Sequence, residues 1–261
     1  MKENVDFNTL LFNLSRKFDL YIYMPTIIKP NYKNLLLNNI DSIVSDYEIK
    51  GFVISNISGF ELLKKYIGNE KYTFIANYTM NIFNEYSIQE LQSLGINVVT
   101  PSVELNKSIL QNLCSNSPLP VELIAYGRNV LMNSSYCILG KSNKCYPKCD
   151  MKCKNCTSST FASLSDNLNT SVTDNSCTAK YYIKDRLGFK FRIIPDNIQT
   201  VTSIYNSKIT SIDTHDFKIS AVRINILDEN IEEINNIVTS VKNGNKLEGK
   251  EYTNGNLNRD I

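Results

Sequence analysis

Short apolar runs alternate with longer amphipathic segments over the first half of the chain. The runs at 20–28, 51–56 and 120–127 are nearly continuously apolar, which is typical of strands that are covered on both faces. The segments that follow the early runs carry apolar residues at helical spacing, as Leu36 and Ile40 do after the first run. Repeated strand–helix units predict a parallel sheet covered by helices, so the expected fold class is α/β.

The last third of the chain begins with a different pattern. Apolar and polar residues alternate over 180–196 on both sides of Leu187–Gly188, which predicts a small β-hairpin. A buried strand at 219–227 and a helix over 228–244 then form one more strand–helix unit. Acidic residues in the first turn favour the start of this helix, and Gly244 is a typical C-cap.

Two further local signals concern a helix in the first half and the end of the chain. Ser87 and Glu90 have the spacing of a capping box, and Gly95 has the position of a C-cap for the same helix. The final segment, 247–261, is polar, and we expect it to be extended.

Polar side chains gather where the predicted strands end. Asn56, Asn77 and Asn81 follow apolar runs, and so do Glu104 and Arg128. Ligands bind at the carboxyl edge of parallel α/β sheets, so these residues are candidates for a binding or catalytic site. Asparagine is also a common helix cap and turn former, and this alternative stays open for the three asparagines. A turn does not need a long charged side chain, so Glu104 and Arg128 are the stronger candidates.

Six of the seven cysteines lie in one polar segment that is rich in lysine, serine and asparagine. Such a segment has too few apolar residues to build a core of its own. Thiolates at short spacing are the usual ligands of zinc or of an iron–sulfur cluster, and nearby lysines favour the thiolate form. The alternative is a loop in which the cysteines bind no metal. The candidate ligands are Cys137, Cys145, Cys149, Cys153, Cys156 and Cys177, and spacing alone does not select four of them.

Composition and charge remove several classes of function. With 28 Lys+Arg against 26 Asp+Glu, the net charge of +2 is too small for sequence-independent attraction to phosphate backbones. Polar residues interrupt every apolar stretch before it reaches a membrane-spanning length, so we expect no membrane span, no signal peptide and a cytoplasmic location. An odd number of cysteines then argues against a disulfide framework. The single histidine, His215, excludes a two-histidine zinc-protease motif and is expected in a turn or on the surface.

Seven stretches that cover most of residues 70–261 have a recognisable order. They are NYTMNIFN, TPSVEL, ELIAYGRNVLMNSSYCILG, YYIKDRLGFKFRIIPDN, SIYNSK, AVRINILDEN and EYTNGNLNRD. In sequence and order they resemble the C-terminal portion of the collagenase-like peptidases, the unassigned peptidase family U32. This resemblance implies a TIM-barrel-like α/β fold and an iron–sulfur cluster held by cysteines after the YGR strand. Some relatives hydroxylate a pyrimidine in transfer or ribosomal RNA, and others are called proteases or collagenases.

The resemblance also assigns roles to individual residues. Cys137 matches the first cluster cysteine of the family, Cys145 or Cys149 the second, and Cys177 the third. These four are the expected sulfur ligands, with zinc as the alternative metal; the two competing ligands are Cys153 and Cys156. Two residues match motifs that would line the pocket at the strand ends: Arg128 matches the arginine of the YGR motif, and Glu104 the glutamate of a SPEL-like motif.

The chain departs from the family pattern at three points. The last cluster cysteine of the family falls at Thr200, and the histidine of the tail motif falls at Asn256. The glycine- and proline-marked strands of the N-terminal barrel half are missing, so the expected sheet is a partial TIM-barrel-like one. An open sheet leaves edges to cover, so the missing barrel half or another chain is an expected partner.

These patterns predict three regions and leave three functions open. The regions are a partial βα barrel-like domain at 1–136, a cysteine-rich insertion at 137–179, and a β-hairpin with a final βα unit and a polar tail at 180–261. The first function is the C-terminal part of an iron–sulfur-dependent enzyme that hydroxylates a pyrimidine in RNA. The second is a collagenase-like protease with a peptide substrate. The third is a non-catalytic metal-binding or scaffold module.

Overall fold

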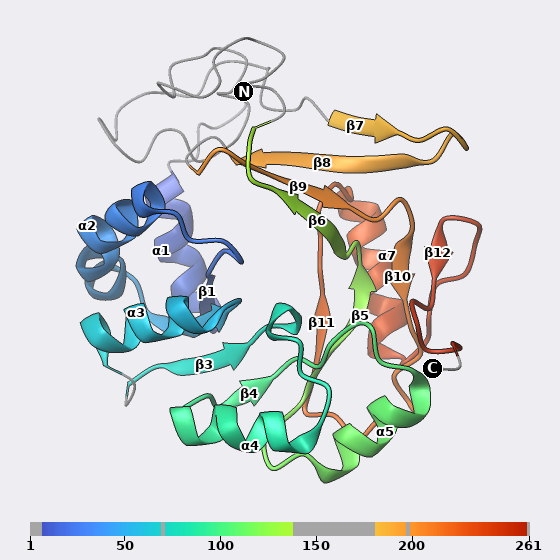
Figure 1. Cartoon of the computed structure of the whole chain (residues 1–261), viewed down its shortest axis with the longest axis horizontal. Coiled ribbons are helices and arrows are strands. Elements are labelled where there is room, and N and C mark those ends of the chain that lie inside the picture. The colour runs from blue at the N-terminus through green and yellow to red at the C-terminus, as the bar shows by residue number, and fades with distance from the viewer. Residues whose placement is uncertain (1–6, 69–70, 138–180, 197–198, 260–261) are drawn as a thin grey trace. The chain divides into compact units, whose positions relative to one another are not determined.

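The computed structural model describes residues 7–68, 71–137, 181–196 and 199–259 (Figure 1). The chain forms two compact units that are interleaved along the sequence. Unit 1 comprises Met1–Leu11, Ile28–Ser42 and Asn129–Ser207, and unit 2 comprises Phe12–Ile27, Ile43–Arg128 and Lys208–Ile261. Of the predicted cysteine-rich insertion at 137–179, the structure describes only Cys137; the rest lies outside the described residues.

Unit 2 contains the predicted parallel sheet, and its strands are β1 (Leu20–Tyr23), β2 (Ile49–Ile54), β3 (Thr73–Ala76) and β4 (Val98–Val99), in that order. All three neighbouring pairs are parallel. A parallel bridge between Val99 and Val121 continues the series to β5 (Glu122–Gly127), which pairs in parallel with β11 (Ala221–Ile224). The prediction of an α/β fold with a parallel sheet is therefore confirmed.

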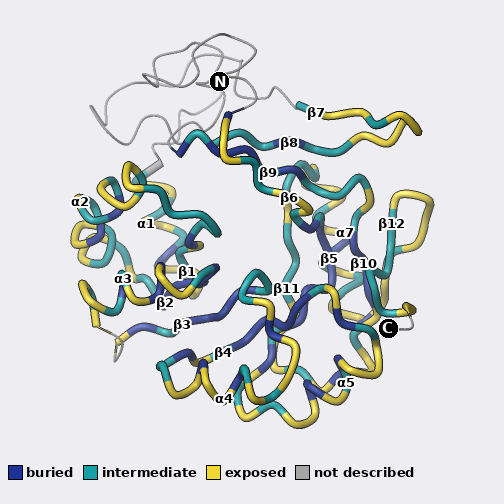
Figure 2. The backbone as a smooth tube through the Cα atoms, viewed as in Figure 1, coloured by how far each residue is buried: buried dark blue, intermediate teal, exposed yellow. Residues whose placement is uncertain are grey.

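A helix follows most strands of this series. The helices of the described residues are α1 (Phe7–Lys17), α2 (Pro30–Asp46), α3 (Ile57–Ile67), α4 (Glu85–Leu94), α5 (Lys107–Asn116) and α7 (Ile231–Lys242), with a short 3-10 turn η1 (Tyr78–Met80) after β3. The core between β2, β3 and α3 is aromatic. The ring of Phe74 lies 6.0 Å from that of Phe52 and 5.1 Å from that of Phe60, and all three side chains are fully buried. Figure 2 shows this burial along β3 and β5.

Helix α4 begins earlier than the sequence predicts. Its N-cap is Asn84, whose side-chain oxygen accepts a hydrogen bond from the backbone N–H of Ser87 at 2.9 Å. The predicted capping box at Ser87 and Glu90 is therefore wrong, because Ser87 already lies inside the first turn. The end of the helix agrees with the prediction, since Gly95 follows with a φ of 108°.

Two further strands of unit 2 pack beside β5. β10 (Ile209–Ser211) is antiparallel to β5, and β12 (Tyr252–Thr253) is parallel to β10. The tail is therefore extended only in part. Beyond β12 it turns back, and the carbonyl of Leu257 accepts a hydrogen bond from the backbone N–H of Lys107 at 3.0 Å.

Unit 1 contains an antiparallel sheet of four strands, and their order is β6 (Val130–Ser134), β9 (Val201–Tyr205), β8 (Lys190–Asp196) and β7 (Tyr181–Lys184). β7 and β8 form the predicted hairpin (Figure 1). Its turn is held by Asp185, whose carboxylate accepts hydrogen bonds from the backbone N–H groups of Leu187 and Phe189. Among the described residues, no helix is both long enough and apolar enough to cross a membrane.

Candidate functional site

The three asparagines at the strand ends separate into two kinds. Asn56 caps α3, because its side-chain oxygen accepts a hydrogen bond from the N–H of Gly59 at 2.6 Å. Asn81 ends the turn η1 in a left-handed conformation with a φ of 53°. Asn77 makes no such cap with its side chain and is fully buried. Of the three, only Asn77 is therefore placed to do more than cap or turn the chain.

The side chain of Asn77 is the centre of a hydrogen-bonded network that connects the strands of the parallel series. Its amide nitrogen donates to the hydroxyl of Tyr23 at 2.6 Å and to the hydroxyl of Ser55 at 3.2 Å. Its amide oxygen accepts from the guanidinium of Arg223 at 2.7 Å. β1, β3 and β11 thus contact one another through one side chain. We call this set the inner polar network, and it comprises Tyr23, Ser55, Asn77, Thr100, Glu122 and Arg223.

An ion pair lies at one end of the inner polar network. The guanidinium of Arg223 lies 2.5 Å from the carboxylate of Glu122, and these side chains are only 12% and 14% exposed. The same carboxylate accepts a hydrogen bond from the hydroxyl of Thr100 at 2.8 Å. Burying two charges costs several kcal/mol per ion before the attraction between them is counted. Such a pair adds little net stability to a fold, so its place in the network makes it a candidate for fixing the geometry of this part of the sheet.

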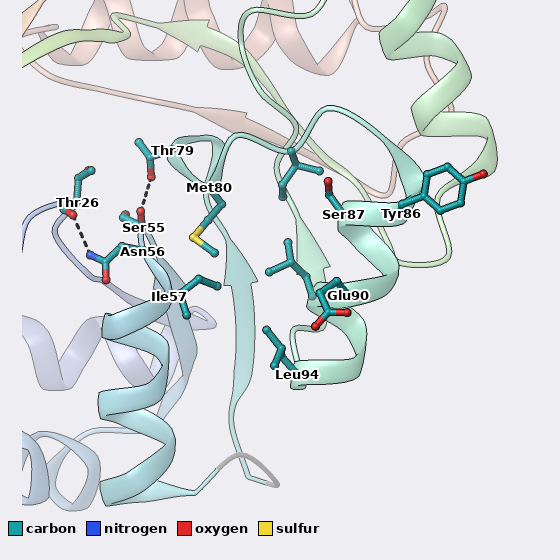
Figure 3. A pocket seen from close by; sticks show the side chains of 12 residues that line it. Thr26, Ser55, Asn56, Ile57, Thr79, Met80, Tyr86, Ser87, Glu90 and Leu94 are labelled. Atoms are coloured by element: carbon teal, nitrogen blue, oxygen red, sulfur yellow. Dashed lines mark hydrogen bonds between the residues drawn. The ribbon is translucent and has the colours of Figure 1, made fainter.

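A cavity of about 680 Å³ lies at the carboxyl edge of β2 and β3, between α3 and α4 (Figure 3). We call it the carboxyl-edge cavity. Its volume is within the range typical of small-molecule sites. Ser55, a member of the inner polar network, lines it together with Thr79. Thr79 accepts a hydrogen bond from Asn77 at 3.2 Å and donates one to the carbonyl of Ser55 at 2.9 Å.

The rest of the cavity lining combines an apolar surface with one carboxylate. Ile57, Met80, Leu91 and Leu94 supply the apolar part. Glu90 is the only charged residue of the lining, and it extends from α4 beside Leu94 (Figure 3). Among the described residues, no ion pair involves the carboxylate of Glu90. The lining therefore offers apolar contacts and one solvent-exposed hydrogen-bond acceptor to a ligand.

The two charged residues that the sequence singles out lie apart from this cavity. Glu104 is exposed in the loop between β4 and α5, and its backbone N–H donates to the hydroxyl of Ser102 at 3.3 Å. Arg128 is half-buried just after β5, near Tyr126. Burial and the Glu229 carboxylate raise the pKa of Tyr126, and Arg128 opposes this rise. Neither Glu104 nor Arg128 lines the carboxyl-edge cavity, and their predicted pocket role stays a prediction.

Of the predicted sulfur ligands, Cys137 is buried just beyond β6, and the others lie outside the described residues. β6 pairs with β9, where Ser134 lies opposite Thr202. The backbone carbonyl of Tyr136, next to Cys137, accepts a hydrogen bond from the hydroxyl of Thr202 at 3.0 Å. The hydroxyl of Thr200 accepts a hydrogen bond from the ammonium of Lys29 at 3.5 Å. The described residues contain no group of three or more His, Cys, Asp or Glu that could hold a metal.

His215 is an exposed turn residue, as expected from the sequence. Its backbone N–H and its ring Nδ1 both lie 2.9 Å from the carboxylate of Asp213. This contact lowers the pKa of Asp213, chiefly through the backbone hydrogen bond. The histidine lines a second cavity, beside β11 and α7, and not the carboxyl-edge cavity.

Sequence reasoning missed Glu122, Arg223 and the lining residue Glu90. A signal for the first two was present, because each is a charged residue inside an otherwise apolar strand run, PVELIAYG and AVRINIL. Glu90 was interpreted as part of a capping box. Its helix begins two residues before Ser87, and this earlier start leaves the carboxylate of Glu90 at the cavity.

Comparisons with known proteins give a limited likeness. No family model matches the chain, and no curated protein matches it. A solved structure of the U32 peptidase Mk0906 is similar, with a TM-score of 0.36 and 16% sequence identity over 46% of this chain. The chain spans about half of that structure, since the match covers 51% of its length. The likeness is weak, and it concerns part of each chain.

Proposed function

We propose that this chain is the C-terminal part of a U32-like protein that takes part in hydroxylating a pyrimidine in RNA, and that the carboxyl-edge cavity holds the base. The observation that carries the proposal is the chemistry of the cavity, where an apolar surface and one carboxylate lie against the inner polar network. A base offers an apolar ring face and N–H groups at its edge. Both features have a counterpart in the lining.

The carboxylate of Glu90 gives the cavity a preference among bases. A carboxylate accepts hydrogen bonds from the exocyclic amine of cytosine, whereas uracil has a carbonyl oxygen at the same place. Ile57, Met80 and Leu94 can pack against the ring. The cavity should therefore favour cytosine over uracil.

The inner polar network stabilises the wall of this cavity. Ser55 and Thr79 are held by Asn77, which is itself held by Arg223. Catalytic and binding groups must keep their geometry within a fraction of an ångström, and a buried, fully bonded network provides such rigidity. This role explains why the fold retains a buried ion pair.

An iron–sulfur cluster is part of the proposal, with zinc as the alternative metal. Of the expected sulfur ligands, Cys137 is the one that the structure describes; the other three thiolates would come from cysteines outside the described residues. Thr200 stands where the resemblance places the last cluster cysteine, and it offers a hydroxyl in place of a thiolate. The described residues therefore do not by themselves fit a cluster, and we derive no reaction step through it.

The proposal is tested by titrating the full chain with cytidine and with uridine, using isothermal calorimetry. We expect cytidine to bind more tightly than uridine, and Glu90→Gln to weaken cytidine binding about tenfold, the effect of one hydrogen bond to a charged group. Glu85→Gln is the matched control, because Glu85 lies on the same helix outside the cavity lining. Equal binding by the two variants, or no binding of cytidine by the wild type, would contradict the proposal.

A further inference from the structure

The hairpin formed by β7 and β8 has two chemically different faces. Residues directly opposite each other in an antiparallel pair share a face. The pairs Tyr181–Ile193 and Ile183–Phe191 therefore form an apolar face, on which Ile193 is 5% exposed. On the same face Ile183 is 39% exposed, so this face is buried only in part.

The opposite face is cationic. It carries the pairs Tyr182–Arg192 and Lys184–Lys190, and we call these four residues the cationic face. The guanidinium of Arg192 lies 5.7 Å from the centroid of the Tyr182 ring, which is a cation–π distance. The side chain of Tyr182 is 47% exposed, so its ring is still accessible to a ligand.

The two lysines of the cationic face lie directly opposite each other. Like charges in this arrangement destabilise a sheet. Among the described residues, no carboxylate forms an ion pair with Lys184 or Lys190. The nearby carboxylate of Asp185 is occupied by the backbone of the turn. Both lysines are exposed, so the two cations are available to one anionic ligand.

The hairpin carries more positive charge than the net charge of the whole chain indicates. Residues 181–192 contain four basic residues and one acidic residue, whereas the net charge of the chain is +2. The cationic face continues onto polar groups of the same sheet. Ile194 pairs with Ser203, which pairs with Asn133, and the hydroxyl of Ser203 donates to the side chain of Asn133 at 2.7 Å. A cationic and polar surface with an exposed ring suits a nucleic acid strand better than the apolar interior of a lipid layer.

We propose that the cationic face of the β7–β8 hairpin binds single-stranded RNA. Lys184 and Lys190 contact phosphates, and Tyr182 stacks on a base. Cations that follow the backbone and aromatic rings that stack on bases are the general means by which proteins hold single strands. The choice of RNA as the strand rests on the proposed function, but the hairpin and the carboxyl-edge cavity are tested separately.

The test is the anisotropy of a fluorescein-labelled single-stranded RNA of about 20 nucleotides, titrated with the full chain at several salt concentrations. For Lys184→Gln/Lys190→Gln we expect the Kd to rise about tenfold at low salt. The slope of log K against log salt should fall by roughly 1.4, at about 0.7 per lost phosphate contact with a single strand. This variant removes a repulsion, so it should fold at least as well as the wild type. Tyr182→Ala should weaken binding at every salt concentration and leave the slope unchanged.

The matched control is Lys50→Gln/Lys218→Gln, which removes the same charge from two exposed sites of unit 2. It should change the Kd less than twofold. Equal losses in the two double variants, or no RNA binding by the wild type, overturn the inference. The inference is also overturned if the chain binds phosphatidylserine vesicles through Lys184 and Lys190 and does not bind RNA. RNA binding through the hairpin without cytidine binding at Glu90 would leave this inference standing and remove the proposed function.

Discussion

Replacing Arg223 by methionine should lower the free energy of unfolding by several kcal/mol, although the change replaces a charged side chain by an apolar one. Methionine fills a similar volume and keeps the strand apolar, so the loss is mainly one of charge and hydrogen bonds. Among the described residues, the substitution leaves the carboxylate of Glu122 with only the hydroxyl of Thr100, and it removes the donor from the buried oxygen of Asn77.

The expected cost follows from the burial of the pair. With side chains 12% and 14% exposed, the pair is close to the buried limit, where removal of one partner costs about 3 to 5 kcal/mol. We expect about 3 kcal/mol from urea titrations followed by circular dichroism, or a fall in Tm of roughly 6 to 12 °C for a chain of this size. Arg16→Met is the control. Its pair with Glu48 is 3.9 Å long and both side chains are more than half exposed, so the cost should stay under about 0.5 kcal/mol.

A double-mutant cycle separates the pair from the rest of the site. Glu122→Gln combined with Arg223→Met should be less destabilising than the sum of the single changes by at least about 1.5 kcal/mol, because the double variant no longer buries an uncompensated charge. Additive free energies would refute the reasoning. So would an Arg223→Met variant that is no less stable than Arg16→Met.

Three further results are expected. Burial raises the pKa of the Cys114 thiol to about 11 from 9.0, so iodoacetamide at pH 8 should not modify it in the native protein, and rapid native alkylation would contradict this. Stability should fall as pH rises from about 9 to 11, because the unfolded chain loses this proton first, and Cys114→Ala should make that fall smaller. Gly244 and Gly255 both have positive φ, so alanine is strained at either position. A Cβ at Gly244 would also lie 2.1 Å from the ring of His215, whereas a Cβ at Gly255 would have open space. Gly244→Ala should therefore lower the Tm more than Gly255→Ala. His215→Ala should remove that difference, and a difference that persists would exclude the ring as its cause. Lys190→Glu should stabilise the hairpin by about 0.2 to 1 kcal/mol, since it places opposite charges across the strands, and a lower Tm would contradict this.

The fold could be predicted where the signal is local. The alternation around Leu187–Gly188 predicts a hairpin and the apolar runs predict the strands of a parallel sheet, and the structure contains both. Burial of the last predicted strand is not confirmed, because no residue of β11 is buried. The start of α4 was misplaced for a local reason as well. Asn84 and Ser87 are both good N-caps, and the choice between them depends on which residue the loop leaves in an extended conformation.

The candidate site could be predicted only in part, because it depends on pairing between distant segments. Glu122 and Arg223 are about a hundred residues apart, and only the parallel register of β5 and β11 brings their side chains together. Asn56 and Asn77 look alike in sequence, yet one caps a helix and the other is buried in the inner polar network. The cationic face could not be predicted from the net charge, because that number sums over the whole chain.

The most direct test of the proposed function is mass spectrometry of nucleosides from cellular RNA. Deletion of the gene should remove a hydroxylated pyrimidine, and a plasmid carrying the wild-type chain with any partner chain it requires should restore it. The Glu85→Gln variant should restore it as well, and Glu90→Gln should not. A hydroxylated pyrimidine content that is unchanged by the deletion, or that Glu90→Gln restores in full, would contradict the account.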